Sequence, residues 1–179
     1  MATASPPLPS SQYVAVHGSR IHYIEAGNQD PPVLLLHGIP THSYIWRNVI
    51  PHIAPIARTV AIDLIGFGHS DKPLDIDYDL PTYARYLEGV IDALELKNPI
   101  IVAMDLGLIV GLHYAMQHEA NVKGLVMFEG FFQPMDFAFY NLPRRARLNL
   151  TMLHVSQIAE LLIVSPQVIA AVHKPLARW

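Results

Sequence analysis

Short apolar runs alternate with helix-like patterns along most of this chain. Two strands joined by a glycine turn are predicted first, at 13–16 and 20–26. Continuous apolar runs, which are typical of strands buried on both faces, follow at 33–36, 59–62, 100–103 and 124–128. Apolar residues at helical spacing occur at 43–53, at 80–94 and after Gly107 as far as Gln117. This order predicts an α/β fold with a doubly wound, mostly parallel sheet that helices cover on both faces.

The pattern changes after Glu129. Residues 130–134 are predicted to form a hinge, and residues 135–179 to form three helical pieces broken by Pro143, Pro166 and Pro175, with no further strand. We interpret this segment as the beginning of a helical cap above the sheet. Residues 1–12 are rich in Pro and Ser and are expected to form a flexible arm. The predicted organisation is therefore an arm at 1–12, the core at 13–132 and a partial cap at 133–179.

Composition narrows the class of protein. Hydrophobic residues make up 51 % of the chain and the net charge is −3, which favours a folded domain without the basic surface that nucleic-acid binding needs. The first residues lack the basic and apolar regions of a secretory signal. The longest apolar stretch, 161–172, is too short to span a bilayer. We therefore expect a cytoplasmic protein with no membrane or nucleic-acid partner.

The residues Ala103-Met-Asp-Leu-Gly107 stand between a predicted strand and a predicted helix. A reactive residue flanked by small ones at such a junction is the pattern of a nucleophile elbow, a strained turn that lifts one side chain above the sheet. The apex here is Asp105, and a carboxylate suits attack on a saturated carbon that bears a leaving group. An Asp at this place is also a common helix N-cap, so both interpretations stay open at this point.

Polar residues follow four of the predicted strands: His37, Asp63, Asp105 and Glu129. Ligand sites in open α/β sheets form at the carboxyl ends of strands, so we expect a pocket there. We predict that Asp105 is the nucleophile and that Glu129 is the carboxylate that orients a histidine. Backbone N–H groups of the loop that begins at His37, and of Leu106, are expected beside the reacting group.

No cofactor or metal site is predicted. The ten histidines invite a metal interpretation, but His113 and His118 miss the i, i+4 spacing of a zinc-binding helix. The run Gly66-Phe-Gly-His-Ser70 is not a dinucleotide fingerprint, and it does not continue into the Gly-x-Ser-x-Gly motif of serine hydrolases. His37 is expected to support the shape of its loop rather than to react.

Four segments resemble the haloalkane dehalogenases, which have the α/β-hydrolase fold. They lie at 36–41, 43–48, 50–55 and 63–73, and the last, Asp-Leu-Ile-Gly-Phe-Gly-His-Ser-Asp-Lys-Pro, is the most specific. The resemblance implies that Asp105 cleaves carbon–halogen bonds through an alkyl ester, which water then hydrolyses. It also implies that Glu129 partners the catalytic histidine and that the substrate is a small apolar halogenated compound.

The chain departs from that family at the halide site. The family has a Trp directly after the nucleophile and commonly an Asn after His-Gly, and both donate hydrogen bonds to the halide. Leu106 and Ile39 stand at these positions, and their side chains cannot donate. We therefore assign oxyanion and halide binding at Ile39 and Leu106 to backbone N–H groups alone, which should weaken stabilisation of the leaving halide.

The family's histidine base lies beyond the cap, and neither His154 nor His173 matches it. We therefore expect that the C-terminal part of the fold is missing and that the chain alone is impaired or inactive. The sheet is expected to end in an exposed edge, covered by a partner or by self-association.

Two alternatives stay open. Epoxide hydrolases are similar in having an Asp elbow and a His-Gly-x-Pro loop, which Ile39-Pro40 satisfies, and an epoxide is then the substrate. They need cap tyrosines, and Tyr140 is the only one in the predicted cap. The other alternative is a non-catalytic, truncated homologue that binds a ligand or a partner.

Overall fold

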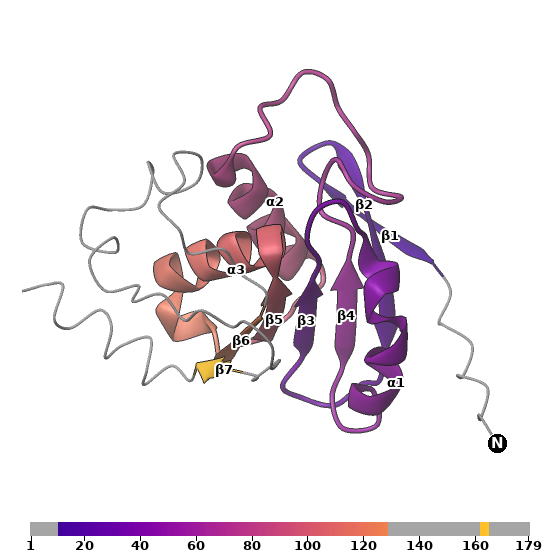
Figure 1. The fold of residues 1–179 in the computed structure, drawn as a ribbon, viewed down its shortest axis with the longest axis vertical. Coiled ribbons are helices and arrows are strands. Elements are labelled where there is room, and N and C mark those ends of the chain that lie inside the picture. The colour runs from indigo at the N-terminus through magenta and orange to yellow at the C-terminus, as the bar shows by residue number, and fades with distance from the viewer. Residues whose placement is uncertain (1–10, 129–161, 165–179) are drawn as a thin grey trace, which may run out of the picture.

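A mixed sheet of seven strands forms the centre of the molecule (Figure 1), which is a computed structural model that describes residues 11–128 and 162–164. The strand order is β1-β2-β4-β3-β5-β6-β7. The strands are Gln12–Val16 (β1), Ser19–Ala26 (β2), Val33–Leu36 (β3), Thr59–Ile62 (β4), Ile100–Met104 (β5), Gly124–Phe128 (β6) and Leu162–Val164 (β7).

The four central strands, β4, β3, β5 and β6, are parallel to one another, whereas β1, β2 and β7 run antiparallel to their neighbours. The predicted α/β sheet is therefore confirmed, and the predicted strands agree with the observed ones to within one residue at each end. Because the central strands are parallel, the residues that follow them meet at one edge of the sheet.

Helices cover both faces of the sheet, as predicted. The 3₁₀ helix Ser43–Asn48 (η1) and the short helix Ile50–Ile53 (α1) lie on one face. The helices Leu80–Ala93 (α2) and Asp105–Gln117 (α3) pack on the other face (Figure 1). A further 3₁₀ helix, Glu119–Asn121 (η2), follows α3. The predicted helix over 43–53 is divided in two because Pro51, in the first turn of α1, has no N–H with which to continue η1.

Alternate residues of β3 serve the two hydrophobic cores. Leu34 and Leu36 join the cluster beneath α2 and α3, whereas Val33 and Leu35 join the cluster beneath η1 and α1. Leu34, Leu35 and Leu36 are 0 % exposed, so both faces of this strand are dry. A strand buried on both faces explains the uninterrupted apolar run in the sequence.

The prediction that no strand follows Glu129 is wrong for Leu162–Val164, which forms β7. This strand pairs antiparallel with β6, with Leu125 opposite Val164 and Met127 opposite Leu162. A three-residue apolar run has no period that separates helix from strand, and the edge of β6 offers backbone hydrogen bonds to it. Part of the edge that we expected to be open is therefore paired within the chain.

The rest of the predicted cap and residues 1–10 of the predicted arm lie outside the described residues, as does Glu129. Gln12, which we assigned to the arm, belongs to β1 instead. Among the described helices, none has the length and apolar character needed to cross a membrane.

Candidate functional site

The chain turns sharply from β5 into α3 at Asp105. This residue has φ +48°, a left-handed conformation that is uncommon for a residue with a side chain and that costs about 1–3 kcal/mol. Met104, in an extended conformation, occupies the N-cap position of α3, and its side chain makes no capping hydrogen bond. The N-cap interpretation of Asp105 is therefore wrong, and the backbone has the strained geometry of an elbow.

Small residues surround the elbow because the backbone of the neighbouring loop lies against it. A Cβ atom added to Gly107 would lie 2.5 Å from the carbonyl oxygen of His37. A Cβ atom added to Gly38 would overlap the side chain of Asp105 and would lie 2.8 Å from its Oδ1 atom. The close approach of Gly38 to Asp105 was not evident from the sequence, because the two residues follow different strands.

One oxygen of the Asp105 carboxylate accepts two backbone hydrogen bonds. The N–H of Ile39 donates to Oδ1 over 2.9 Å, and the N–H of Leu106 donates to the same atom over 2.7 Å. These are the two backbone groups that the sequence placed beside the reacting centre. Within the described residues nothing donates to Oδ2, so the half-buried carboxylate has one held oxygen and one free oxygen.

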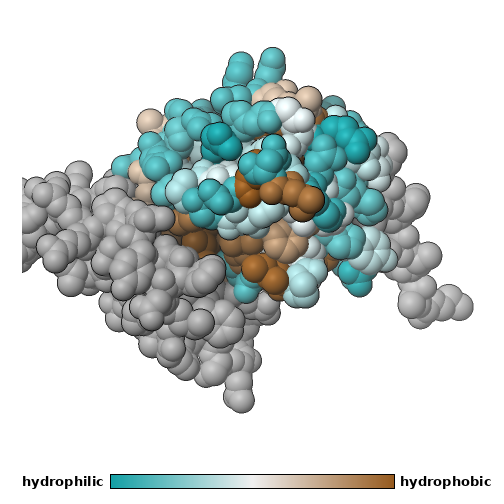
Figure 2. Space-filling model, turned by 90° about the horizontal axis from the view of Figure 1, so that it is seen from above, coloured by the Kyte–Doolittle hydropathy of each residue, from teal (hydrophilic) through white to brown (hydrophobic). Residues whose placement is uncertain are grey.

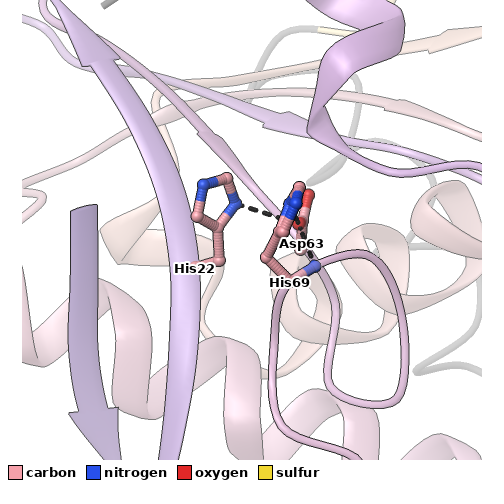
Figure 3. Close-up of side chains that lie close together, drawn as sticks. All are labelled: His22, Asp63 and His69. Carbon is pink, nitrogen blue, oxygen red and sulfur yellow. Dashed lines mark hydrogen bonds and ion pairs between the residues drawn. The ribbon is translucent and has the colours of Figure 1, made fainter. Parts of the chain in front are cut away.

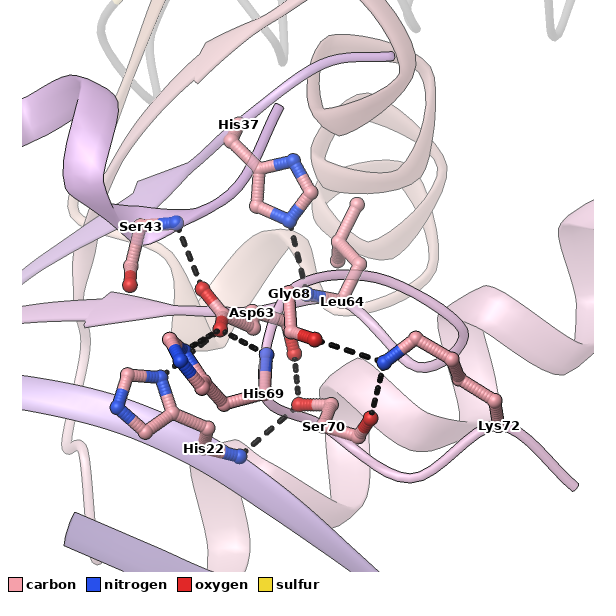
Figure 4. A network of polar contacts seen from close by, with 9 residues as sticks. All are labelled: His22, His37, Ser43, Asp63, Leu64, Gly68, His69, Ser70 and Lys72. Atoms are coloured by element: carbon pink, nitrogen blue, oxygen red, sulfur yellow. Dashed lines mark hydrogen bonds and ion pairs between the residues drawn. The ribbon is translucent and has the colours of Figure 1, made fainter. Parts of the chain in front are cut away.

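His37 shapes the loop that carries Ile39. Its ring is 0 % exposed, and its Nε2 accepts the N–H of Leu64 over 3.0 Å (Figure 4). Its Nδ1 donates to the carbonyl of Gly38 over 2.9 Å. These two bonds require the neutral imidazole with the proton on Nδ1. Burial lowers the pKa of His37 and favours the same neutral form. The ring supports the loop, as predicted, and has no nitrogen left for proton transfer.

Asp63 lies behind the site and is 0 % exposed, so it is not part of the pocket wall that we expected. Its Oδ1 accepts the N–H of Ser43 over 2.6 Å and its Oδ2 accepts the N–H of His69 over 2.8 Å (Figure 4). Burial alone would raise the pKa of Asp63, but the hydrogen bonds from His69 and Ser43 lower it overall. The ionised carboxylate therefore anchors η1 and, through it, the loop that bears Ile39.

The segment 63–73, which carried the most specific resemblance, is a loop closed by its own polar groups. The hydroxyl of Ser70 donates to the carbonyl of Asp63 over 2.6 Å and accepts the N–H of His22 over 2.9 Å. The ammonium group of Lys72 donates to the carbonyls of Gly68 and Ser70 over 2.7 and 3.0 Å (Figure 4). These side chains therefore have a structural role at this loop.

The structure thus brings together Asp105, Ile39 and Leu106, while Glu129 lies outside the described residues. Ile39 is 58 % exposed, and apolar surface bordered by hydrophilic residues is visible on the face seen in Figure 2. His22 and His69 converge on Asp63, a contact between β2 and the loop after β4 that no spacing along the chain signals.

Three comparisons with known proteins agree on the family. A family model described as the alpha/beta hydrolase fold matches residues 31–153. A haloalkane dehalogenase of Mesorhizobium japonicum is 43% identical over 138 residues, which are 74% of this chain and 44% of that enzyme. A haloalkane dehalogenase of Bradyrhizobium diazoefficiens is 45% identical over 121 residues, which are 67% of this chain and 38% of that enzyme.

A solved structure is similar over the same region. The crystal structure of the haloalkane dehalogenase DbeA-M1 loop variant from Bradyrhizobium elkanii superposes with a TM-score of 0.66 at 45% sequence identity. The superposition covers 70% of this chain and 41% of that one. The chain therefore spans less than half the length of each of these relatives.

Proposed function

This chain belongs to the α/β-hydrolase fold family as a haloalkane dehalogenase-like member, and on that premise we propose that Asp105 is the nucleophile of a carbon–halogen bond hydrolase. The observation that carries the proposal is the asymmetry of the Asp105 carboxylate. Two N–H groups hold Oδ1, and Oδ2 is left to react. The strained elbow fixes the direction of the side chain before the substrate arrives.

In the first step, Oδ2 attacks the carbon that bears the halogen. A carbon–oxygen bond forms, the carbon–halogen bond breaks with its electron pair going to the halide, and Asp105 becomes an alkyl ester. In the second step, a base takes a proton from water, the water oxygen bonds to Cγ, and negative charge develops on Oδ1. The N–H groups of Ile39 and Leu106 already point at that atom and stabilise the charge there. The Cγ–Oδ2 bond then breaks, the alcohol leaves with Oδ2 and the proton returned by the base, and the carboxylate is restored with the water oxygen in it.

Ile39 and Leu106 provide little stabilisation for the leaving halide. The N–H groups of Ile39 and Leu106 are both engaged with Oδ1, and neither side chain has a hydrogen-bond donor. We therefore expect bromide and iodide, which leave more readily, to be displaced measurably faster than chloride. The exposed apolar side chain of Ile39, whose N–H contacts Asp105, favours a small apolar haloalkane.

The second step needs a base to activate water. We propose that residues 1–179 carry out the first step alone and that the ester then persists, because none of their histidines matches the position of the family's base. Glu129 would orient that histidine in a longer protein, and its own geometry lies outside the described residues.

The test is intact-mass spectrometry of the full 179-residue chain after incubation with 1-bromobutane. We expect a mass gain of one butyl group per chain, mapped to Asp105 by peptide sequencing, and no gain in Asp105→Asn. The Asn variant is the matched control because Asn also tolerates the left-handed conformation and its carbonyl oxygen can accept the same two N–H groups.

Other outcomes separate the alternatives. A hydroxyalkyl adduct formed with styrene oxide but no adduct with 1-bromobutane would favour the epoxide hydrolase. If a folded sample gains no mass with either compound, the nucleophile proposal is wrong and a non-catalytic binding protein remains. Butanol released without an accumulating adduct would contradict the proposal that the ester persists.

A further inference from the structure

Three side chains of metal-binding type converge from separate parts of the chain (Figure 3). His22 belongs to β2, Asp63 follows β4, and His69 lies in the loop after it. Their ligand atoms all lie within 4.8 Å of one another. The shortest approaches are from Asp63 Oδ2 to His22 Nδ1, 2.9 Å, and to His69 Nδ1, 3.6 Å.

His22 is the unusual member of this cluster. It is 2 % exposed, yet neither ring nitrogen has a hydrogen-bond partner among the described residues. Its Nδ1 is near enough to Asp63 to count as an ion pair, but the geometry is not that of a hydrogen bond. Because buried polar atoms are normally partnered, this imidazole aimed at a buried carboxylate needs an explanation.

The carboxylate of Asp63 is held in a fixed orientation by the backbone N–H groups of Ser43 and His69. Hydrogen bonds from neighbouring groups to a ligating side chain orient that side chain towards the ion. Oδ2 keeps a second lone pair after accepting the N–H of His69.

The two distances to the Asp63 carboxylate are close to those of a small tetrahedral ion. In a tetrahedral zinc site with bonds of about 2.0–2.1 Å, ligand atoms are separated by roughly 3.3 Å. The two distances to Asp63 Oδ2, 2.9 and 3.6 Å, lie on either side of this value. The side chain of His69 is 62 % exposed, so an ion can reach the cluster from solvent.

We propose that His22, Asp63 and His69 bind one zinc-class divalent ion, with water as the fourth ligand. Two imidazoles and one carboxylate suit Zn²⁺, Co²⁺ or Ni²⁺, whereas Mg²⁺ and Ca²⁺ favour sites made of oxygen ligands. The ion would join β2 to the loop after β4. The site does not depend on the proposed reaction at Asp105.

The test uses the full chain purified without a polyhistidine tag and freed of metal by a chelator that is then removed. Titration with zinc chloride in a calorimeter is expected to show one ion bound per chain, and the Tm is expected to rise with zinc. Co²⁺ is expected to give the visible absorption of a tetrahedral complex. In His69→Ala, affinity should fall by at least about tenfold, because removing a ligand should cost no less than removing a group that orients one.

The His69→Ala variant is informative because the side chain is mostly exposed, so its loss should leave the fold intact, which circular dichroism verifies. His52→Ala is the matched control, since His52 is an exposed histidine of α1 outside the cluster, and its zinc affinity should equal that of the parent chain. Absence of zinc binding by the parent chain overturns the proposal. Undiminished binding by His69→Ala overturns it as well, because the ion would then lie elsewhere.

Discussion

At the scale of single residues, the site depends on Gly38 as much as on Asp105. The backbone of Gly38 lies so close to the elbow that any side chain there would overlap the Cβ and Cγ atoms of Asp105. Gly38 is not in the left-handed region, so its need for glycine is purely steric. Sequence order placed Asp105 at the apex of the turn, but it carried no sign of this contact across two strands.

We predict that Gly38→Ala slows alkylation of Asp105 by 1-bromobutane about 100-fold, the loss typical of a displaced catalytic group. Gly18→Ala is the control: Gly18 has φ +82° and no atom within 4 Å of an added Cβ. That variant should lower the free energy of unfolding by about 1 kcal/mol and leave the alkylation rate unchanged. Initial rates of alkylation, measured by mass spectrometry, test this prediction. Equal rates in the two variants would contradict the steric role of Gly38.

At the scale of elements, α2 shows what local sequence determines well. Its apolar residues recur at helical spacing, and the observed helix begins at Leu80 as predicted. Asp79 is the N-cap, and its carboxylate accepts the N–H of Thr82 over 2.9 Å. By contrast, the helix predicted over 43–53 is divided, because Pro51 has no backbone N–H with which to continue it. Apolar periodicity gives no sign of a missing N–H.

Replacing Asp79 by Ala should lower the free energy of unfolding by about 1 kcal/mol, because the N–H of Thr82 loses its partner. Asp79→Asn should stay close to the parent chain, since Asn is an equally good N-cap. Urea unfolding at neutral pH measures both variants. Equal losses in the two would mean that the charge, rather than the cap hydrogen bond, stabilises the helix.

The same residue predicts a pH dependence. The hydrogen bond from Thr82 lowers the pKa of Asp79 in the folded chain below its unfolded value of about 3.9. Its contribution is therefore fully present above that unfolded value and is lost as the pH falls through the lower folded value. The stability difference between the parent chain and Asp79→Ala should accordingly shrink in acid, and a difference that grows in acid would contradict the assignment.

At the scale of the whole molecule, the sheet order decides which strands are protected. β3 lies between two parallel neighbours and contributes to both cores. Within residues 11–128 and 162–164, β1 pairs with β2 alone, and its Tyr13 is 48 % exposed. Strands at the centre of a sheet open only when most of the fold opens, while edge strands open locally. The chain therefore has an uneven distribution of local stability.

Hydrogen exchange followed by mass spectrometry should show this difference. Peptides that cover β3 and β5 are expected to exchange at rates near those of global unfolding, and peptides that cover β1 should exchange faster. Uniform protection across the three strands would show that the sheet opens as one unit.

The sequence by itself determined strands β1 to β6, helices α2 and α3, and the elbow, because each is set by residues that are neighbours in the chain. Apolar periodicity located β3, β4 and β6, and Ala103-x-Asp105-x-Gly107 located the turn. Only the tertiary structure decided that two N–H groups share Oδ1 of Asp105 and that Asp63 is sealed from solvent. Such contacts depend on strand order and register, which the packing of the whole chain sets.

The histidine cluster shows the same limit most clearly. β2 pairs with β4 so that Tyr23 lies opposite Ile62, and this register carries His22 to Asp63, whose N–H donates to the carbonyl of His22 over 2.9 Å. A shift of one residue would turn His22 to the opposite face of the sheet. The residue types were present in the sequence, but the pairing of two distant strands decided that they meet.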